Sequence, residues 1–200
     1  TRISGELGIP KGLDSAAAAN TTGGRGAIES LAASPVGKGT IWVGTNNGLI
    51  HVTRDAGKTW ADVSIADLPN PRRANVSGIE ASHVNAGEAY AAIEYQRLGD
   101  YSPYVYRTRD FGKTWTKIVE GLPVREPAGS VVRVVREDPK KTGLLFAGTE
   151  TGVQISFDDG DHWQSLSLNL PNTSYRDLTI KGNDLIAGTY GRGIWVLDDI

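Results

Sequence analysis

The feature that most constrains this chain is an eight-residue motif that occurs three times at intervals of about fifty residues. The copies are TRDAGKTW at 53–60, TRDFGKTW at 108–115 and SFDDGDHW at 156–163, which we call the Asp corners. A Gly-Thr pair precedes the first and the third corner, at 44–45 and 148–149, and occurs again at 188–189. A Leu-Pro pair follows each corner, at 68–69, 122–123 and 170–171. Matches at several offsets within one period predict tandem supersecondary units.

Each repeat predicts four short strands. The expected strands are 27–33, 41–45, 49–53 and 60–64; then 76–82, 89–95, 104–108 and 114–119; then 131–136, 144–149, 153–156 and 162–168; and finally 175–181, 185–189 and 194–197. Helical periodicity is absent, and the helix-favouring run at 16–19 is too short to matter. Repeated four-stranded units predict an all-β fold, a β-propeller of four-stranded antiparallel blades.

The expected organisation is a connector followed by blades. Residues 1–26 are rich in small residues and predict an extended connector, in which Arg2, Ile3 and Ser4 are a candidate end of a preceding blade. The blades are expected at 27–68, 69–122 and 123–170, with an incomplete one at 171–200. We expect these roughly four blades to be part of a larger ring, because propellers use about four to eight blades.

Composition excludes several functions. The 200 residues carry 21 Lys+Arg and 23 Asp+Glu, a formal net charge of −2, whereas nucleic-acid binders are usually basic. No apolar run reaches the roughly 18 residues that span a bilayer. The absence of cysteine rules out disulfides and thiolate zinc sites. The three histidines show no metal-ligand spacing, so we predict no metal and no cofactor.

The chemistry of the Asp corners is that of a scaffold. An aspartate in a tight hairpin can accept hydrogen bonds from unpaired backbone N–H groups, glycine supplies conformational freedom, and tryptophan buries a large ring. An acid repeated in every blade cannot belong to one active site. We therefore assign structural roles to Asp55, Gly57, Trp60, Asp110, Gly112, Trp115, Asp158, Gly160 and Trp163.

These corners resemble the Asp-box, or bacterial neuraminidase repeat, of sialidases, some xyloglucan-cleaving glycosidases and sortilin-type propellers. The flanks IWVGTNNG at 41–48 and GTYGRGIWVLDD at 188–199 are similar to large bacterial proteins described as sortilin-like or as glycosyl hydrolases with these repeats. The resemblance covers about residues 27–200 and implies a propeller in an exported protein, periplasmic, secreted or at the cell surface. The Arg-Ile-Pro signature of sialidases is absent.

A binding site is expected on the face opposite the Asp corners, which we call the loop face. It collects the connections between second and third strands, at 46–47, 94–103, 150–151 and 190–192, with the crossovers at 65–75, 120–129 and 169–174. The binding candidates are Arg72, Arg73, Tyr95, Arg97, Tyr101, Arg125, Tyr190 and Arg192. The insert at 94–103 mixes aromatic and charged residues. It suits either a sugar or peptide ligand or packing against a neighbouring domain.

Three functional hypotheses remain open. The first is a non-catalytic propeller module that presents its loop face to a protein or glycan partner. The second is a glycoside hydrolase whose cleft is completed by further blades, with Glu94, Asp100, Glu126 and Glu150 as candidate acids, because such enzymes need two carboxyls roughly 5–9 Å apart. The third is a domain of an exported assembly that only buries surface, with the remaining blades or domains of the same protein as its partners.

Overall fold

The structure is a computed structural model that describes residues 1–21, 24–124, 131–166 and 168–200. Blade 1 consists of β1 (Ile28–Ala33), β2 (Ile41–Thr45), β3 (Ile50–Thr53) and β4 (Ala61–Asp62). Blade 2 consists of β5 (Asn75–Ala81), β6 (Ala89–Tyr95), β7 (Asp100–Thr108) and β8 (Thr116–Lys117). Blade 3 consists of β9 (Val132–Glu137), β10 (Leu145–Thr149), β11 (Val153–Ser156) and β12 (Gln164–Ser165). Blade 4 consists of β13 (Tyr175–Lys181), β14 (Asp184–Thr189) and β15 (Ile194–Leu197).

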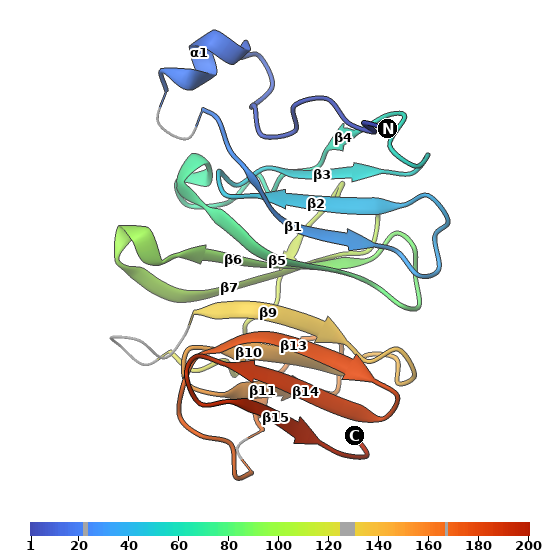
Figure 1. Cartoon of the computed structure of the whole chain (residues 1–200), viewed down its shortest axis with the longest axis vertical. Coiled ribbons are helices and arrows are strands. Elements are labelled where there is room, and N and C mark those ends of the chain that lie inside the picture. The colour runs from blue at the N-terminus through green and yellow to red at the C-terminus, as the bar shows by residue number, and fades with distance from the viewer. Residues whose placement is uncertain (22–23, 125–130, 167) are drawn as a thin grey trace.

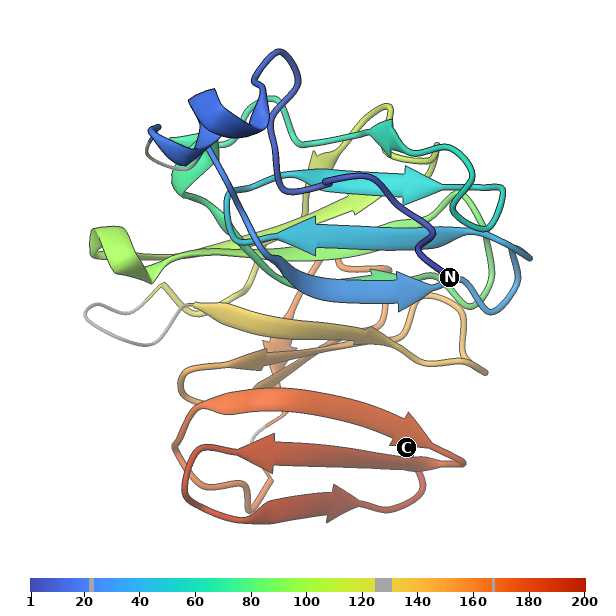
Figure 2. The same cartoon turned by 45° about the horizontal axis from the view of Figure 1, so that its top comes forward.

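Every blade is an antiparallel sheet whose strands follow chain order. The sheets are stacked one after another along the long axis of the molecule (Figure 1), and the rotated view shows the same succession (Figure 2). The first strand of each blade faces its neighbours: β5 packs on β1 and β2, β9 on β5 and β6, and β13 on β9 and β10. The predicted all-β propeller of four-stranded blades is confirmed, and the four blades form an open arc in the described part of the chain.

Hydrophobic clusters fill the spaces between successive blades. Trp42, on β2, is completely buried and meets the Trp115 ring edge to face, with ring centroids 6.2 Å apart. Equivalent clusters join blade 2 to blade 3 around Trp163, and blade 3 to blade 4 around Tyr175. Each blade therefore depends on its neighbour for a core, as expected for repeats that cannot bury a sheet face alone.

The outer strands are shorter than the sequence predicts. β4, β8 and β12 each span two residues, because only two residues pair with the third strand before the chain leaves for the next blade. β7 is longer than expected and begins at Asp100, so residues 100–103 of the 94–103 insert are strand. Between β6 and β7 the insert forms a 3-10 helix, η2 (Gln96–Leu98).

Two short helices lie outside the blades. Helix α1 (Ser15–Ala19) is capped by the Asp14 carboxylate, which accepts a hydrogen bond from the Ala17 N–H group at 2.7 Å. The 3-10 helix η1 (Pro71–Arg73) lies in the crossover from blade 1 to blade 2. Among the described residues no helix is long and apolar enough to cross a membrane.

Candidate functional site

The three Asp corners share one hydrogen-bond pattern. The Asp55 carboxylate accepts from the Thr59 N–H group at 2.9 Å, the Thr59 hydroxyl at 2.7 Å and the Thr53 hydroxyl at 2.8 Å. Asp110 and Asp158 make the same three contacts in their own hairpins, with His162 Nδ1 replacing the threonine hydroxyl at Asp158. Donors of this kind stabilise a charged carboxylate. They hold the pKa of Asp55 and of Asp158 at about 2 and lower the pKa of Asp110.

The residue after each corner acid has left-handed backbone. Ala56, Phe111 and Asp159 have φ angles of 59°, 60° and 63°. The glycine that follows touches the preceding part of the chain: a Cβ on Gly112 would lie 2.6 Å from Val63 Cβ, and one on Gly160 would lie 2.5 Å from Ile118 Cδ1. Glycine is needed at these positions both for its positive φ and for this close approach.

The left-handed residue connects neighbouring blades. Arg54 of blade 1 stacks its guanidinium 3.9 Å above the Phe111 ring of blade 2. Arg109, the equivalent residue of blade 2, forms an ion pair with Asp159 of blade 3. The position that varies within the corner therefore carries the contact between blades, a role that the repeat alone does not reveal.

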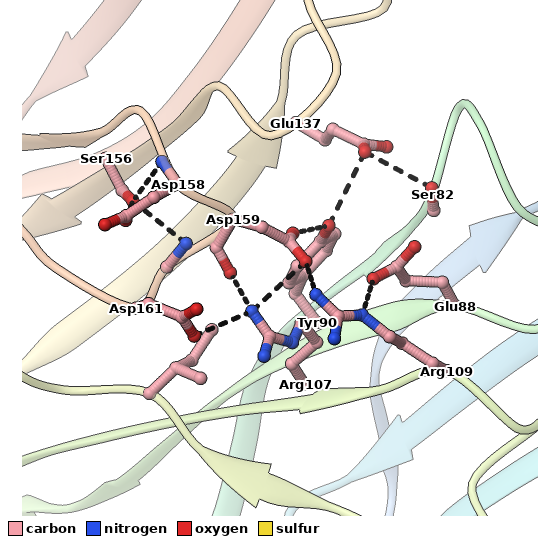
Figure 3. A network of polar contacts seen from close by, with 12 residues as sticks. Ser82, Glu88, Tyr90, Arg107, Arg109, Glu137, Ser156, Asp158, Asp159 and Asp161 are labelled. Carbon is pink, nitrogen blue, oxygen red and sulfur yellow. Dashed lines mark hydrogen bonds and ion pairs between the residues drawn. The ribbon is translucent and has the colours of Figure 1, made fainter.

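Asp159 is the centre of a polar network between blades 2 and 3 (Figure 3). Its carboxylate accepts from the Tyr90 hydroxyl at 2.5 Å and pairs with Arg107 at 3.1 Å as well as with Arg109. Arg107 also pairs with Asp161 at 3.1 Å, and Arg109 with Glu88 at 3.0 Å. We call these residues, together with Glu137, the interblade network.

Glu137 is the most deeply buried acid of this network. It is 2% exposed and accepts hydrogen bonds from the His83 N–H group and, at 3.2 Å, from the Ser82 hydroxyl. Burial nevertheless raises the pKa of Glu137, and burial beside Asp159 raises that of Glu88. Burial also raises the pKa of Tyr90, which stays a hydrogen-bond donor. This network joins blades 2 and 3, and each of its carboxylates pairs with Arg107 or Arg109 or accepts hydrogen bonds.

On the loop face, Arg133 of β9 holds two candidate acids together. Its guanidinium donates to Glu150 at 2.5 Å and to Glu94, and to the Gln96 side chain at 2.5 Å. The Asn75 amide donates to Glu94 at 2.7 Å. We call these five residues the Arg133 cluster. Sequence reasoning placed Glu94 and Glu150 on one face but missed Arg133, which lies inside a strand.

The Arg133 cluster opens onto a groove along the inner strands. The groove is lined by side chains of β1, β5, β9 and β13, among them Glu29, Ser77, Arg133, Arg136, Arg176 and Asp177. Arg136 pairs with Asp177 at 3.0 Å and reaches Glu80 at 3.5 Å. The groove is therefore polar, and two of its arginines, Arg133 and Arg136, form ion pairs.

The other insert residues divide between buried and accessible. Tyr95 is 3% exposed and packs against Tyr104 with ring centroids 5.1 Å apart, so it lies in the core and not on the surface expected of a binding residue. Asp100 accepts hydrogen bonds from the Tyr104 hydroxyl at 2.8 Å and the Ser102 N–H group at 2.9 Å. Burial and this contact raise the pKa of Tyr104 to about 12. Arg97 is exposed and Tyr101 is half-buried.

The remaining predicted residues lie in separate places on the loop face. Arg72 and Arg73 are exposed on η1, and Arg192 is exposed in the turn after β14. Tyr190 is 71% exposed, with the Arg176 guanidinium 5.1 Å from its ring centre. Among the residues described, the side chains of Arg72, Arg73 and Arg192 form no ion pair. Arg125 and Glu126 lie outside the described residues.

The three described candidate acids, Glu94, Asp100 and Glu150, therefore interact with other groups of the chain itself. Glu94 and Glu150 share one guanidinium, and Asp100 is held by its own β7. Glycoside hydrolysis needs two carboxyl groups on either side of the scissile bond. One is an acid with a raised pKa that donates a proton, and the other acts as nucleophile or base. The described residues contain no group of three or more histidine or acidic side chains suited to a metal ion.

The chain consists of antiparallel sheets that pack on one another through their inner strands, and the Asp corners contact the neighbouring sheets. This arrangement is that of β-propeller blades. No family model matches it. It is 31% identical over 120 residues to an oligoxyloglucan-reducing end-specific xyloglucanase of Emericella nidulans, a match that covers 60% of this chain and 14% of that protein.

Solved structures show the same fold. The GH74 enzyme of Niastella koreensis superposes with a TM-score of 0.65 at 15% identity, covering 86% of this chain and 28% of that one. The structure described as YCF48 bound to D1 peptide superposes with a TM-score of 0.62 at 18% identity, covering 90% and 52%. This chain therefore spans about half, or less, of the length of these three proteins.

Proposed function

We propose that this chain is a non-catalytic propeller segment, of the Asp-box type, that binds a glycan or protein partner on its loop face. The observation that carries the proposal is the state of the described candidate acids Glu94, Asp100 and Glu150, each of which forms an ion pair or hydrogen bonds within the chain. Exposed arginines and aromatic rings remain to contact a partner. Such side chains dominate binding energy in many interfaces. The exported location predicted from the sequence belongs to the same proposal.

A glycan is the first partner to test, because the protein that is 31% identical to this chain over 120 residues is a xyloglucanase. We expect xyloglucan oligosaccharides to bind, measured by calorimetry. The triple variant Arg97→Ala, Tyr101→Ala, Arg192→Ala should weaken binding at least about tenfold, since it removes three contacts of the loop face. Its melting temperature should stay close to that of the unchanged protein.

The matched control is a triple variant on the opposite face. Lys58 and Lys113 are exposed cations and Phe157 is an exposed ring, all in the Asp corners. Changing these three to alanine should leave the affinity unchanged. Equal affinity of the loop-face triple variant and the control would exclude the loop face as the binding site. If no glycan binds, a peptide library is the next ligand.

The second candidate is a glycoside hydrolase, and the sequence similarity to a xyloglucanase favours it. It predicts release of reducing ends from xyloglucan in the same samples, abolished by Glu94→Gln or Glu150→Gln. Asp198→Asn, an exposed acid after β15 and outside the groove, is the control. We expect no turnover by this chain. Turnover that Glu150→Gln abolishes and Asp198→Asn retains would replace the first proposal with the second.

A further inference from the structure

The innermost strand of every blade contains a β-bulge at the same place. Where the first strand of a blade pairs with the second, one extra residue of the first strand has no partner opposite it. A bulge of this kind re-aims the side chain of the extra residue. The four bulged residues, in chain order, are Glu29, Ser77, Arg133 and Arg176, and all four line the groove along the inner strands. The bulges therefore select side chains that the blades present to this groove.

The two bulged arginines lie beside the end of the second strand of their own blades. In blade 3 the Arg133 guanidinium donates to Glu150, which directly follows β10. In blade 4 the Arg176 guanidinium lies 5.1 Å from the ring centre of Tyr190, which directly follows β14. The arginines are therefore in equivalent positions, but the partner from their own blade is a carboxylate for Arg133 and a tyrosine ring for Arg176.

The preceding blade supplies an acid to Arg133 but not to Arg176. Arg133 forms an ion pair with Glu94 of blade 2, which has the same register in its blade as Glu150 has in blade 3. For Arg176 the corresponding residue of the preceding blade is Glu150 itself, and Glu150 is paired with Arg133. Both positions from which Arg133 takes a carboxylate therefore exist for Arg176 within blades 3 and 4, and neither gives it a counter-ion.

Arg176 is consequently a cation of the groove whose charge is not paired. Its side chain is exposed, and it forms no ion pair and no side-chain hydrogen bond among the described residues. Asp177, the next residue, pairs with Arg136 at 3.0 Å. A guanidinium binds a carboxylate through two parallel hydrogen bonds, so a carboxylate from outside the chain is a suitable partner for Arg176.

The backbone of Tyr190 is fixed beside this guanidinium. The Tyr190 N–H group donates to the Ser174 carbonyl at 2.8 Å, and the Tyr190 carbonyl accepts from the Thr173 hydroxyl at 3.1 Å. A tyrosine ring presents an apolar face and a polar hydroxyl at its edge. A sugar ring that carries a carboxylate matches both groups, because its C–H face packs on an aromatic ring while its carboxylate meets the guanidinium.

We propose that Arg176 and Tyr190 form a subsite for a uronic acid residue of an acidic oligosaccharide. The inference rests on the proposed function, because it names the kind of glycan that the loop face binds. The strands β1, β5, β9 and β13 follow one another along the stack (Figure 1). Glu29, the acidic bulged residue, is on β1 and Arg176 is on β13, so the carboxylate binds at the β13 end of the groove.

The test compares two forms of one ligand, a trimer of galacturonic acid and its methyl ester, which has the same sugar rings without the charge. Calorimetry with the 200-residue chain should show that the acid binds at least about tenfold more tightly than the ester, because the ester cannot form an ion pair with Arg176. Arg176→Gln should bind both forms alike. Its melting temperature should be unchanged, since the side chain is exposed. Tyr190→Ala should weaken the binding of both forms.

The control variant is Lys181→Gln, which removes an exposed positive charge from the other end of β13. It should keep the preference for the acid, because the net charge of the protein is not its cause. Equal affinity of the unchanged protein for acid and ester would overturn the inference, as would a preference that persists in Arg176→Gln or binding of neither form. In each of these cases xyloglucan or peptide binding on the loop face would leave the proposed function standing, and its absence would remove that function as well.

Discussion

The Asp corners show how one carboxylate can organise a hairpin. Asp55 receives backbone and hydroxyl donors from residues on both sides of its own turn, and these donors favour the ionised form. A carboxyl whose pKa is lowered in the folded state stabilises the fold above its ordinary pKa, 3.8 for aspartate. That stability is lost as the pH falls through the folded value. For Asp55 and Asp158 this window runs from about 3.8 down to about 2.

The first prediction concerns this pKa. Thr59→Val removes the hydroxyl that donates to Asp55 and should raise the pKa of Asp55 from about 2 toward 3.8. Carboxyl carbon NMR across an acid titration measures it directly. Thr114→Val, which alters the neighbouring corner instead, should raise the pKa of Asp110 and leave Asp55 unchanged. If Asp55 titrates at 3.8 in the protein without substitutions, the corner does not stabilise the charged form of Asp55.

At the level of elements, the strands were predictable because each has its own local pattern. The predicted bounds of β2, β6, β11, β13 and β15 agree with the structure residue for residue. The outer strands β4, β8 and β12 were predicted too long, because the apolar residues around them face neighbouring blades and not a strand partner: Trp115 and Trp163 contact the preceding blade, and Val63 and Ile118 the next one. Apolar periodicity cannot distinguish these two environments.

The contacts between blades could not be predicted in the same way. The residue after the corner acid is Ala56, Phe111 or Asp159, and its chemistry matters only because a particular arginine of the preceding blade reaches it. Arg133 was missed for a related reason. It lies within β9, where a charged residue suggests a solvated position, and its partners come from two other segments of the chain. Pairings of this kind depend on the three-dimensional arrangement of the blades.

The interblade network gives a prediction with a definite sign. An acid with a raised pKa in the folded state stabilises the fold below its ordinary pKa, 4.5 for glutamate, and that contribution is lost as the pH rises through the folded value. Glutamine at position 137 cannot ionise. The variant Glu137→Gln should therefore not show the loss of stability that ionisation of Glu137 causes as the pH rises. Urea midpoints measured from pH 4.5 upward should fall less in the variant than in the unchanged protein. Glu29→Gln should follow the unchanged profile, and parallel profiles for all three proteins would refute the assignment.

Across the whole molecule, stability should follow the number of neighbours that each blade has. Blades 2 and 3 are covered on both faces by other blades, whereas within the described residues of this 200-residue chain blades 1 and 4 each have one face without a neighbouring blade. A sheet that shares its core with one neighbour has fewer buried contacts to lose when it opens, and local opening governs amide exchange. The two ends of the arc are therefore expected to open first.

Hydrogen exchange of the 200-residue chain tests this gradient. Amides of β6 and β10 should exchange at least about tenfold more slowly than those of β14 and β15, because the inner sheets open only when a neighbour opens too. Blade 1 should fall between these limits, since residues 1–9 already cover its outer hairpin through Trp60. Equal protection of all four blades in the single chain would mean that the array unfolds as one unit, and that neighbour contacts do not set its local stability.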